Sequence, residues 1–183
     1  MKKVTLLLLL FSSVCLAQMT DDEFAYNKKQ ALALDEQSKG ESLKYFAKIE
    51  PFAKDSLWFN YGISKAYFYM IYNRLGYLKT EEAAVKKVET ALTYTLKCSN
   101  GDTLQKYLLR AGFLCHEMAR YYASQSNQMP DKKKEYREKQ IDWLQKSVGY
   151  YDEYVVKKGK TLDFENMTDR GHPKNDLDRL KFE

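Results

Sequence analysis

The stretch 56–72 reads SLWFNYGISKAYFYMIY, and it decides the fold. Seven of its side chains are aromatic, and Lys65 is its only charged residue. A helix that is apolar on every side is normally buried, because a surface helix keeps a polar stripe. The segment would span about 25 Å as a helix, and with Asn60 and several hydroxyls it suits a membrane poorly. It therefore predicts a buried central helix with neighbours on both sides.

The flanking sequence predicts further helices and no strand. Thr20 and Glu23 form a capping box, with acids in the first turn. Pro51 marks the decline of the second helix, and the polar stretch 124–130 is expected to be a loop. Sustained alternation of apolar and polar residues is absent, so the sequence predicts an all-α fold. The expected helices span residues 20–37, 41–51, 56–72, 80–98, 103–123 and 131–156.

Residues 1–17 are typical of a secretory signal peptide. Two lysines precede an apolar run that ends at Phe11, and small residues occupy the cleavage positions up to Ala17. Ser12 stands where a lipoprotein signal usually carries leucine, which disfavours a lipid anchor at Cys15. We therefore expect a cleaved signal and an exported protein, periplasmic or secreted.

The remaining residues divide into an α-helical domain at 18–157 and a tail at 158–183. The tail is polar and punctuated by glycine and proline, so we expect it to be weakly ordered with one short helix near its end. Without the two signal lysines, 28 basic and 25 acidic residues remain, a net charge of about +3. Charges of mixed sign that are spread along the chain do not predict a nucleic-acid surface.

The two cysteines outside the signal, Cys98 and Cys115, are expected to be free. Cys98 ends one predicted helix and Cys115 lies well inside the next, roughly 18 Å away along the axis at 1.5 Å per residue. A disulfide needs Cα atoms within about 7 Å. We therefore expect two buried thiols that behave as small apolar residues.

The helices also echo one another in pairs. Gly62 and Gly112 each lie in the first helix of a pair, where a small residue lets the second helix approach closely. Trp58-x-x-Tyr61-Gly62 resembles the opening W-x-x-L-G of a tetratricopeptide repeat (TPR), and the segments 82–92 and 41–46 are similar to its second helix. The resemblance covers roughly residues 20–157.

This resemblance implies antiparallel helix pairs stacked as a short solenoid of about three pairs. The match is incomplete, because the family unit has about 34 residues whereas Gly62 and Gly112 are fifty apart. Lys65 also stands where the family usually has an aromatic residue. An irregular α-helical bundle is the alternative.

The sequence carries no recognisable catalytic motif. His116-Glu117 begins like a zinc-protease helix, but Arg120 stands where the second histidine would be needed. Phosphate-binding glycine loops and nucleophile motifs are missing. We therefore expect no catalytic residue, no metal site and no cofactor, and we expect that the protein is not an enzyme.

The fifteen tyrosines are the remaining compositional excess. Most lie at core spacing, and tyrosine also serves well in recognition surfaces. The TPR resemblance implies a protein or peptide partner bound in a groove, and the signal peptide places that partner in the cell envelope. The charge distribution and the composition of the helices lead us to expect neither a nucleic-acid partner nor an integral membrane span. We expect these residues to line the groove: Lys65, Tyr67, Tyr69, His116 and Arg120.

Two other functions remain open at this stage. An exported immunity-type protein that neutralises a toxin would favour a protruding charged feature such as residues 124–135. A small hydrolase would need a pocket that joins His116 to two acids from other helices.

Overall fold

The structure is a computed structural model, and it describes residues 19–33, 40–72, 75, 78, 80–159 and 173–182. Throughout these residues the regular elements are helices and no strand occurs, so the all-α prediction is confirmed. The expected signal peptide lies outside the described residues. The helices are α2 (Asp21–Ala33), α3 (Leu43–Ala53), α4 (Leu57–Ile71), α5 (Glu81–Leu96), α6 (Lys106–Gln128), the 3-10 turn η2 (Pro130–Lys132), α7 (Lys133–Lys158) and α8 (Pro173–Phe182).

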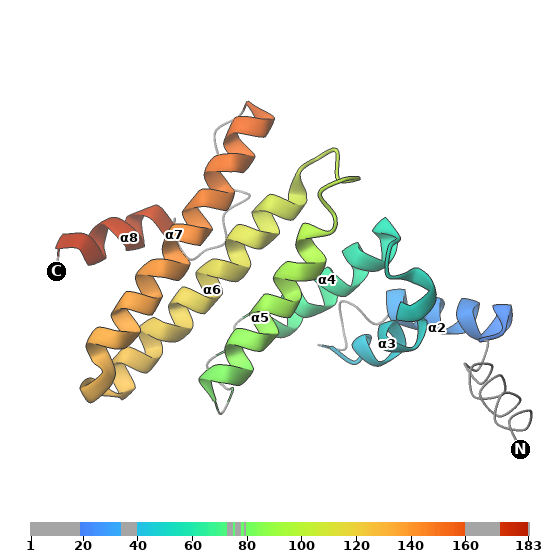
Figure 1. Ribbon diagram of the computed structural model, residues 1–183, viewed down its shortest axis with the longest axis horizontal. Coiled ribbons are helices and arrows are strands. Elements are labelled where there is room, and N and C mark those ends of the chain that lie inside the picture. Colours follow the sequence, from blue (N-terminus) through green and yellow to red (C-terminus); the bar gives the residue numbers. More distant parts are fainter. Residues whose placement is uncertain are drawn as a thin grey trace, which may run out of the picture.

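Helices that follow one another in the chain pack side by side, so the molecule is a row from α2 to α8 (Figure 1). Short connections make antiparallel neighbours. The two longest helices, α6 and α7, share the most extensive contact, and α4 also touches α6. Helix α8 packs on α7 at one end of the row. None of the described helices combines the length and the apolar character that crossing a membrane would need.

The core consists of two main clusters of buried side chains. One lies between α2, α3 and α4 around Phe46 and Phe59, and the larger one joins α5, α6, α7 and α8 around Leu114 and Leu144. Tyr67 of α4 packs against both clusters. The central helix α4 thus connects the two halves of the molecule.

Helix α4 is less buried than its composition predicts. Phe59, Ala66 and Ile71 are fully buried, but Leu57 and Tyr61 remain 42% and 36% exposed. A tyrosine tolerates this position because its hydroxyl stays in water while its ring covers apolar surface. One side of α4 is therefore core and the other is partly open.

Both glycines singled out in the sequence lie at close helix contacts. A Cβ at Gly62 would come within 2.6 Å of the Phe46 ring, and one at Gly112 within 2.9 Å of the Tyr151 ring. The expected approach of the second helix of the pair is therefore confirmed at Gly112, but at Gly62 the prediction is wrong, because the close neighbour is not the following helix α5. The neighbours differ, because Gly62 receives a ring from the preceding helix α3 and Gly112 from the following helix α7.

Two helix ends differ from the prediction. The expected loop at 124–130 is mostly helical, because α6 continues to Gln128, where the Gln128 side chain donates a hydrogen bond to Ser124. Helix α6 ends just before Pro130, which disfavours helical backbone at Met129. Helix α3 runs past Pro51 to Ala53 rather than ending at the proline.

The N-terminal cap is a local contact, whereas the C-terminal helix packs against the core. The Glu23 backbone N–H donates to Thr20 Oγ1 at 3.2 Å, and the Thr20 N–H donates to Glu23 Oε2 at 2.9 Å, which confirms the capping box. In the tail, α8 does not stand apart from the domain, because Leu177 is buried in the core. The tail therefore contributes a packed helix.

Candidate functional site

The half-open side of α4 faces α6, and the two helices place aromatic and basic side chains there. Tyr61, Phe68 and Tyr72 are seven and four residues apart, so they lie on one side of α4. Arg110 and Phe113 are three residues apart on one side of α6. We call these five residues the aromatic–arginine strip.

Three rings form the centre of the strip. The Phe68 and Phe113 ring centroids are 4.7 Å apart, and those of Tyr72 and Phe113 are 5.6 Å apart and nearly parallel. Phe113 is buried, whereas Phe68 and Tyr72 are half-buried. Stacked and tilted pairs at these distances stabilise each other by about 0.5–1.5 kcal/mol beyond burial. The cluster is therefore a fixed surface, with rings that remain partly accessible.

Arg110 holds the other end of the strip. Its guanidinium lies 4.6 Å from the centre of the Tyr61 ring and 5.9 Å from that of Phe68. It donates hydrogen bonds to Ser64 Oγ at 3.0 Å and to the Tyr61 carbonyl at 3.4 Å. Ser64 is itself hydrogen-bonded to buried Thr95 of α5 at 2.7 Å. The cation is thus positioned by three helices.

Lys65 and Tyr69, two of the residues predicted for the groove, border this strip. They lie one turn apart on α4, with the Lys65 ammonium 5.8 Å from the centre of the Tyr69 ring. The Tyr69 ring also meets Phe68 edge to face at 5.6 Å. The structure therefore brings these two residues next to the strip.

Tyr67 lies on the other side of α4. Its ring stacks on Tyr94 of α5 at 6.4 Å, between the two core clusters. Burial, with a contribution from the negative charge of Glu50, raises the pKa of Tyr67 above its usual value. Its place is thus an internal contact between α4 and α5.

His116 and Arg120 are one turn apart on α6 but differ in exposure. His116 is 3% exposed, and its Nε2 lies 3.0 Å from Asp176 Oδ2 of α8. Arg120 has a side chain that is 46% exposed and lies 3.3 Å from Glu117. Arg120 comes seven residues after Phe113, which places it on the side of α6 that carries the strip. His116 instead faces α8.

Arg110 and Phe113 are functional candidates that the sequence analysis missed. Phe113 belongs to the buried apolar face of α6. Arg110 interrupts that apolar face, and a long cation within an apolar stripe is the one signal that could have indicated a packed, ring-contacting role. Its partners on α4 depend on how the two helices meet, which the sequence does not show.

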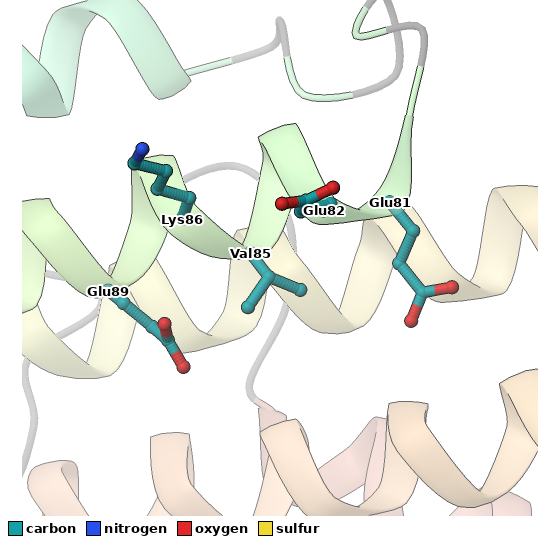
Figure 2. Close-up of a pocket in the computed structure, with 5 residues that line it drawn as sticks. All are labelled: Glu81, Glu82, Val85, Lys86 and Glu89. Atoms are coloured by element: carbon teal, nitrogen blue, oxygen red, sulfur yellow. The ribbon is translucent and has the colours of Figure 1, made fainter.

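A hollow in the surface lies along α5, away from the strip, and Figure 2 shows it. It has a volume of about 490 Å³ and is lined by one helix only, through Glu81, Glu82, Val85, Lys86 and Glu89. Glu81, Val85 and Glu89 point to one side of α5, while Lys86 points to the other. Polar groups from a second element do not converge on it, so it is a weaker candidate than the strip.

The carboxylate of Glu81 at this hollow is already engaged. Lys139 of α7 and the Tyr122 hydroxyl of α6 donate to Glu81 Oε1 at 2.7 and 2.8 Å. Burial alone would raise the pKa of Glu81, but these hydrogen bonds outweigh it and lower the pKa. Lys139 also bonds Glu135 at 2.6 Å, and the two carboxylates raise its pKa. This network joins three helices and is structural.

The part of the chain that the structure describes provides little support for a reactive cysteine nucleophile or a metal-binding site. Cys98 and Cys115 are free and buried, as expected, and burial raises their pKa to about 11 and about 12. Thiols with such pKa values are protonated and unreactive at neutral pH. Among the described residues, no group of three or more histidine, cysteine or acidic side chains could hold a metal ion.

Comparisons of the chain with models of known protein families, with curated proteins and with solved structures find no match.

Proposed function

We propose that the protein binds a protein or peptide partner, without catalysis, through the aromatic–arginine strip and its neighbours Lys65, Tyr69 and Arg120. The observation that carries this proposal is the set of contacts between α4 and α6, in which Arg110 lies over the Tyr61 and Phe68 rings and the half-buried Phe68 and Tyr72 rings pack on Phe113. Tyrosine and arginine dominate binding energy at protein interfaces. Rings that are already ordered lose little conformational entropy on binding.

The charges around the strip favour a partner of particular character. Among the five residues of the strip and its three neighbours, Lys65, Arg110 and Arg120 are basic and none is acidic, while Glu117 pairs with Arg120. The net charge of the surface is therefore positive, which favours an acidic or carboxylate-bearing partner. The hydrogen bonds from Arg110 to Ser64, and between Ser64 and buried Thr95, hold the guanidinium in this position.

We also propose that α2 with α3, α4 with α5, and α6 with α7 are three TPR-like pairs. In support, successive helices pack in chain order, and Gly112 lies at a close contact between the paired helices α6 and α7. The solenoid resemblance would make α2, α4 and α6 the lining of the binding face, as in repeat arrays. Export to the periplasm or the exterior is part of the same proposal and rests on the signal-like residues 1–17.

The test is an affinity capture from the envelope fraction of the source cells, with residues 18–183 as bait. Three baits are compared by quantitative mass spectrometry: the natural chain, Tyr69→Ala/Arg120→Ala, and a control pair with similar exposed residues elsewhere, Tyr26→Ala/Lys133→Ala. We expect a protein that the natural and control baits recover equally and that the first pair loses at least fivefold. Equal recovery by all three baits would contradict the assignment to this face.

A further inference from the structure

A pocket lies at one end of the strip and was not anticipated from the sequence. It has a volume of about 380 Å³ and lies between the start of α4 and the turn that joins α5 to α6. Leu57 and Tyr61 line it from α4, and Gly101, Leu104 and Lys106 line it from the turn and the start of α6. Unlike the hollow on α5, this pocket is built from two separate segments.

The walls of the pocket are unusually apolar for an open surface. Leu57, Tyr61 and Leu104 are 42%, 36% and 54% exposed. They are three of the nine large apolar residues that are exposed in the described part of the chain. Scattered exposed apolar residues need no explanation, whereas a group around one cavity indicates an interaction site.

The turn that forms one wall is held in place. Asp102 Oδ1 accepts a hydrogen bond from the Leu104 N–H at 3.1 Å, and Oδ2 accepts one from the Tyr107 N–H at 2.7 Å. Gln105 adopts a left-handed backbone with φ of 56°, which a residue other than glycine keeps only where its surroundings enforce it. The pocket is therefore formed before any ligand arrives.

The pocket lining contains one base, Lys106, and one acid, Asp102, whose carboxylate is bound within the turn. Both carboxylate oxygens of Asp102 are taken up by backbone N–H groups at the start of α6, where the helix dipole also compensates its charge. Lys106 is exposed at the rim. Arg110 follows one turn later and lies over Tyr61, the residue that belongs to both pocket and strip.

We infer that this pocket anchors one bulky aliphatic or aromatic side chain of an acidic linear peptide, whose carboxylates lie along Lys106 and Arg110 toward the strip. The inference rests on the proposed function and names the chemistry of the partner. A volume of about 380 Å³ is at the low end of the 300–1,000 Å³ of ligand pockets, which suits a side chain rather than a folded element. Apolar walls with Lys106 and Arg110 beside them, and with the Asp102 carboxylate occupied by backbone N–H groups, are complementary to an apolar residue with acidic neighbours.

The test is a selection of phage-displayed random twelve-residue peptides on residues 18–183, followed by affinity measurements on the enriched sequences as fluorescent synthetic peptides. We expect enriched peptides to place a large apolar residue within a few positions of two or more carboxylates. Leu104→Ser should weaken their binding at least fivefold, and so should Lys106→Glu. Met129→Ser and Lys134→Glu, exposed residues at the far end of α6 and the start of α7, are the matched controls and should leave binding unchanged.

The remaining outcomes distinguish a failure of the pocket inference from a failure of the proposed function. Peptides that lose binding with Tyr69→Ala/Arg120→Ala but not with Leu104→Ser or Lys106→Glu would overturn the pocket inference and leave the proposed function standing. Enriched peptides that are neutral or basic would likewise overturn the inference alone. Peptides that are insensitive to all of these variants, or a selection that enriches nothing, would overturn the pocket inference, and the affinity capture described above would then decide the proposed function by itself.

Discussion

Replacing Gly112 by alanine should destabilise the protein, whereas the same replacement at Gly149 should stabilise it. A Cβ at Gly112 would lie 2.9–3.0 Å from three atoms of the Tyr151 ring, across the contact between α6 and α7. Ordinary Cβ contacts begin at about 3.4 Å, so the ring would have to retreat by about half an ångström. A Cβ at Gly149 on α7 would meet nothing within 4 Å.

The magnitudes follow from two opposing terms. Alanine is more favourable than glycine inside a helix by about 1 kcal/mol, and both variants gain this. Overpacking a filled core costs about 1–3 kcal/mol, and only Gly112→Ala should incur this cost. The difference in unfolding free energy between the two variants should therefore equal the overpacking term, about 1–3 kcal/mol.

Urea unfolding followed by far-UV circular dichroism measures this difference, and thermal melts provide a second readout. Gly149→Ala should raise Tm by about 2–4 °C for a chain of this size, and Gly112→Ala should melt below it. Tyr151→Leu should reduce the cost of alanine at position 112, because the ring that it meets is gone. If Gly112→Ala were as stable as Gly149→Ala, the close α6–α7 contact described above would be wrong.

Three further predictions concern the other buried contacts. Tyr122→Phe should lower the unfolding free energy by about 1 kcal/mol at pH 7, measured by urea titration. The pKa of Glu81 is lowered in the folded protein, so the stabilisation by its ionised carboxylate is complete above the usual carboxyl pKa and is lost as pH falls through the pKa of the folded state; the effect of Tyr122→Phe should therefore shrink below about pH 4. A loss that stays constant down to pH 3 would contradict the assignment. Asp176→Ala should cost about 1–2 kcal/mol in urea unfolding, because it leaves buried His116 without its partner on α8, and an unchanged midpoint would argue against that contact. The two buried cysteines should react with a thiol reagent at pH 8 only after urea is added, since their raised pKa values keep them protonated; rapid labelling of the native protein would refute this.

Helix type and position could be predicted from the sequence where the signals are local. The capping box of Thr20 and Glu23 depends on residues three apart, and the structure contains it as expected. Gly62 and Gly112 indicated close helix contacts because a missing Cβ has few other uses in a helix interior. The predicted end of α6 is too early: Ser124 and its polar neighbours favour a loop, but the helix continues to Gln128 and ends just before Pro130.

The candidate site could be predicted less well, because it depends on how helices meet. Lys65 and Tyr69 lie beside the strip, but Arg110 was missed because its partners are on α4, nearly fifty residues away. His116 was expected in an open groove, yet α8 covers it. The docking of α8 depends on tertiary contacts of Leu177 rather than on any periodicity in the polar tail.

The most direct test of the central claim is side-chain oxidation footprinting of the protein with and without the partner that the capture experiment recovers. Tyr61 and Tyr69 report on the proposed binding face, and Tyr26, which is 57% exposed on α2, is an internal control. The account predicts that labelling of Tyr61 and Tyr69 falls severalfold in the complex while that of Tyr26 is unchanged. Protection of Tyr26 with unchanged labelling of Tyr61 and Tyr69 would contradict it.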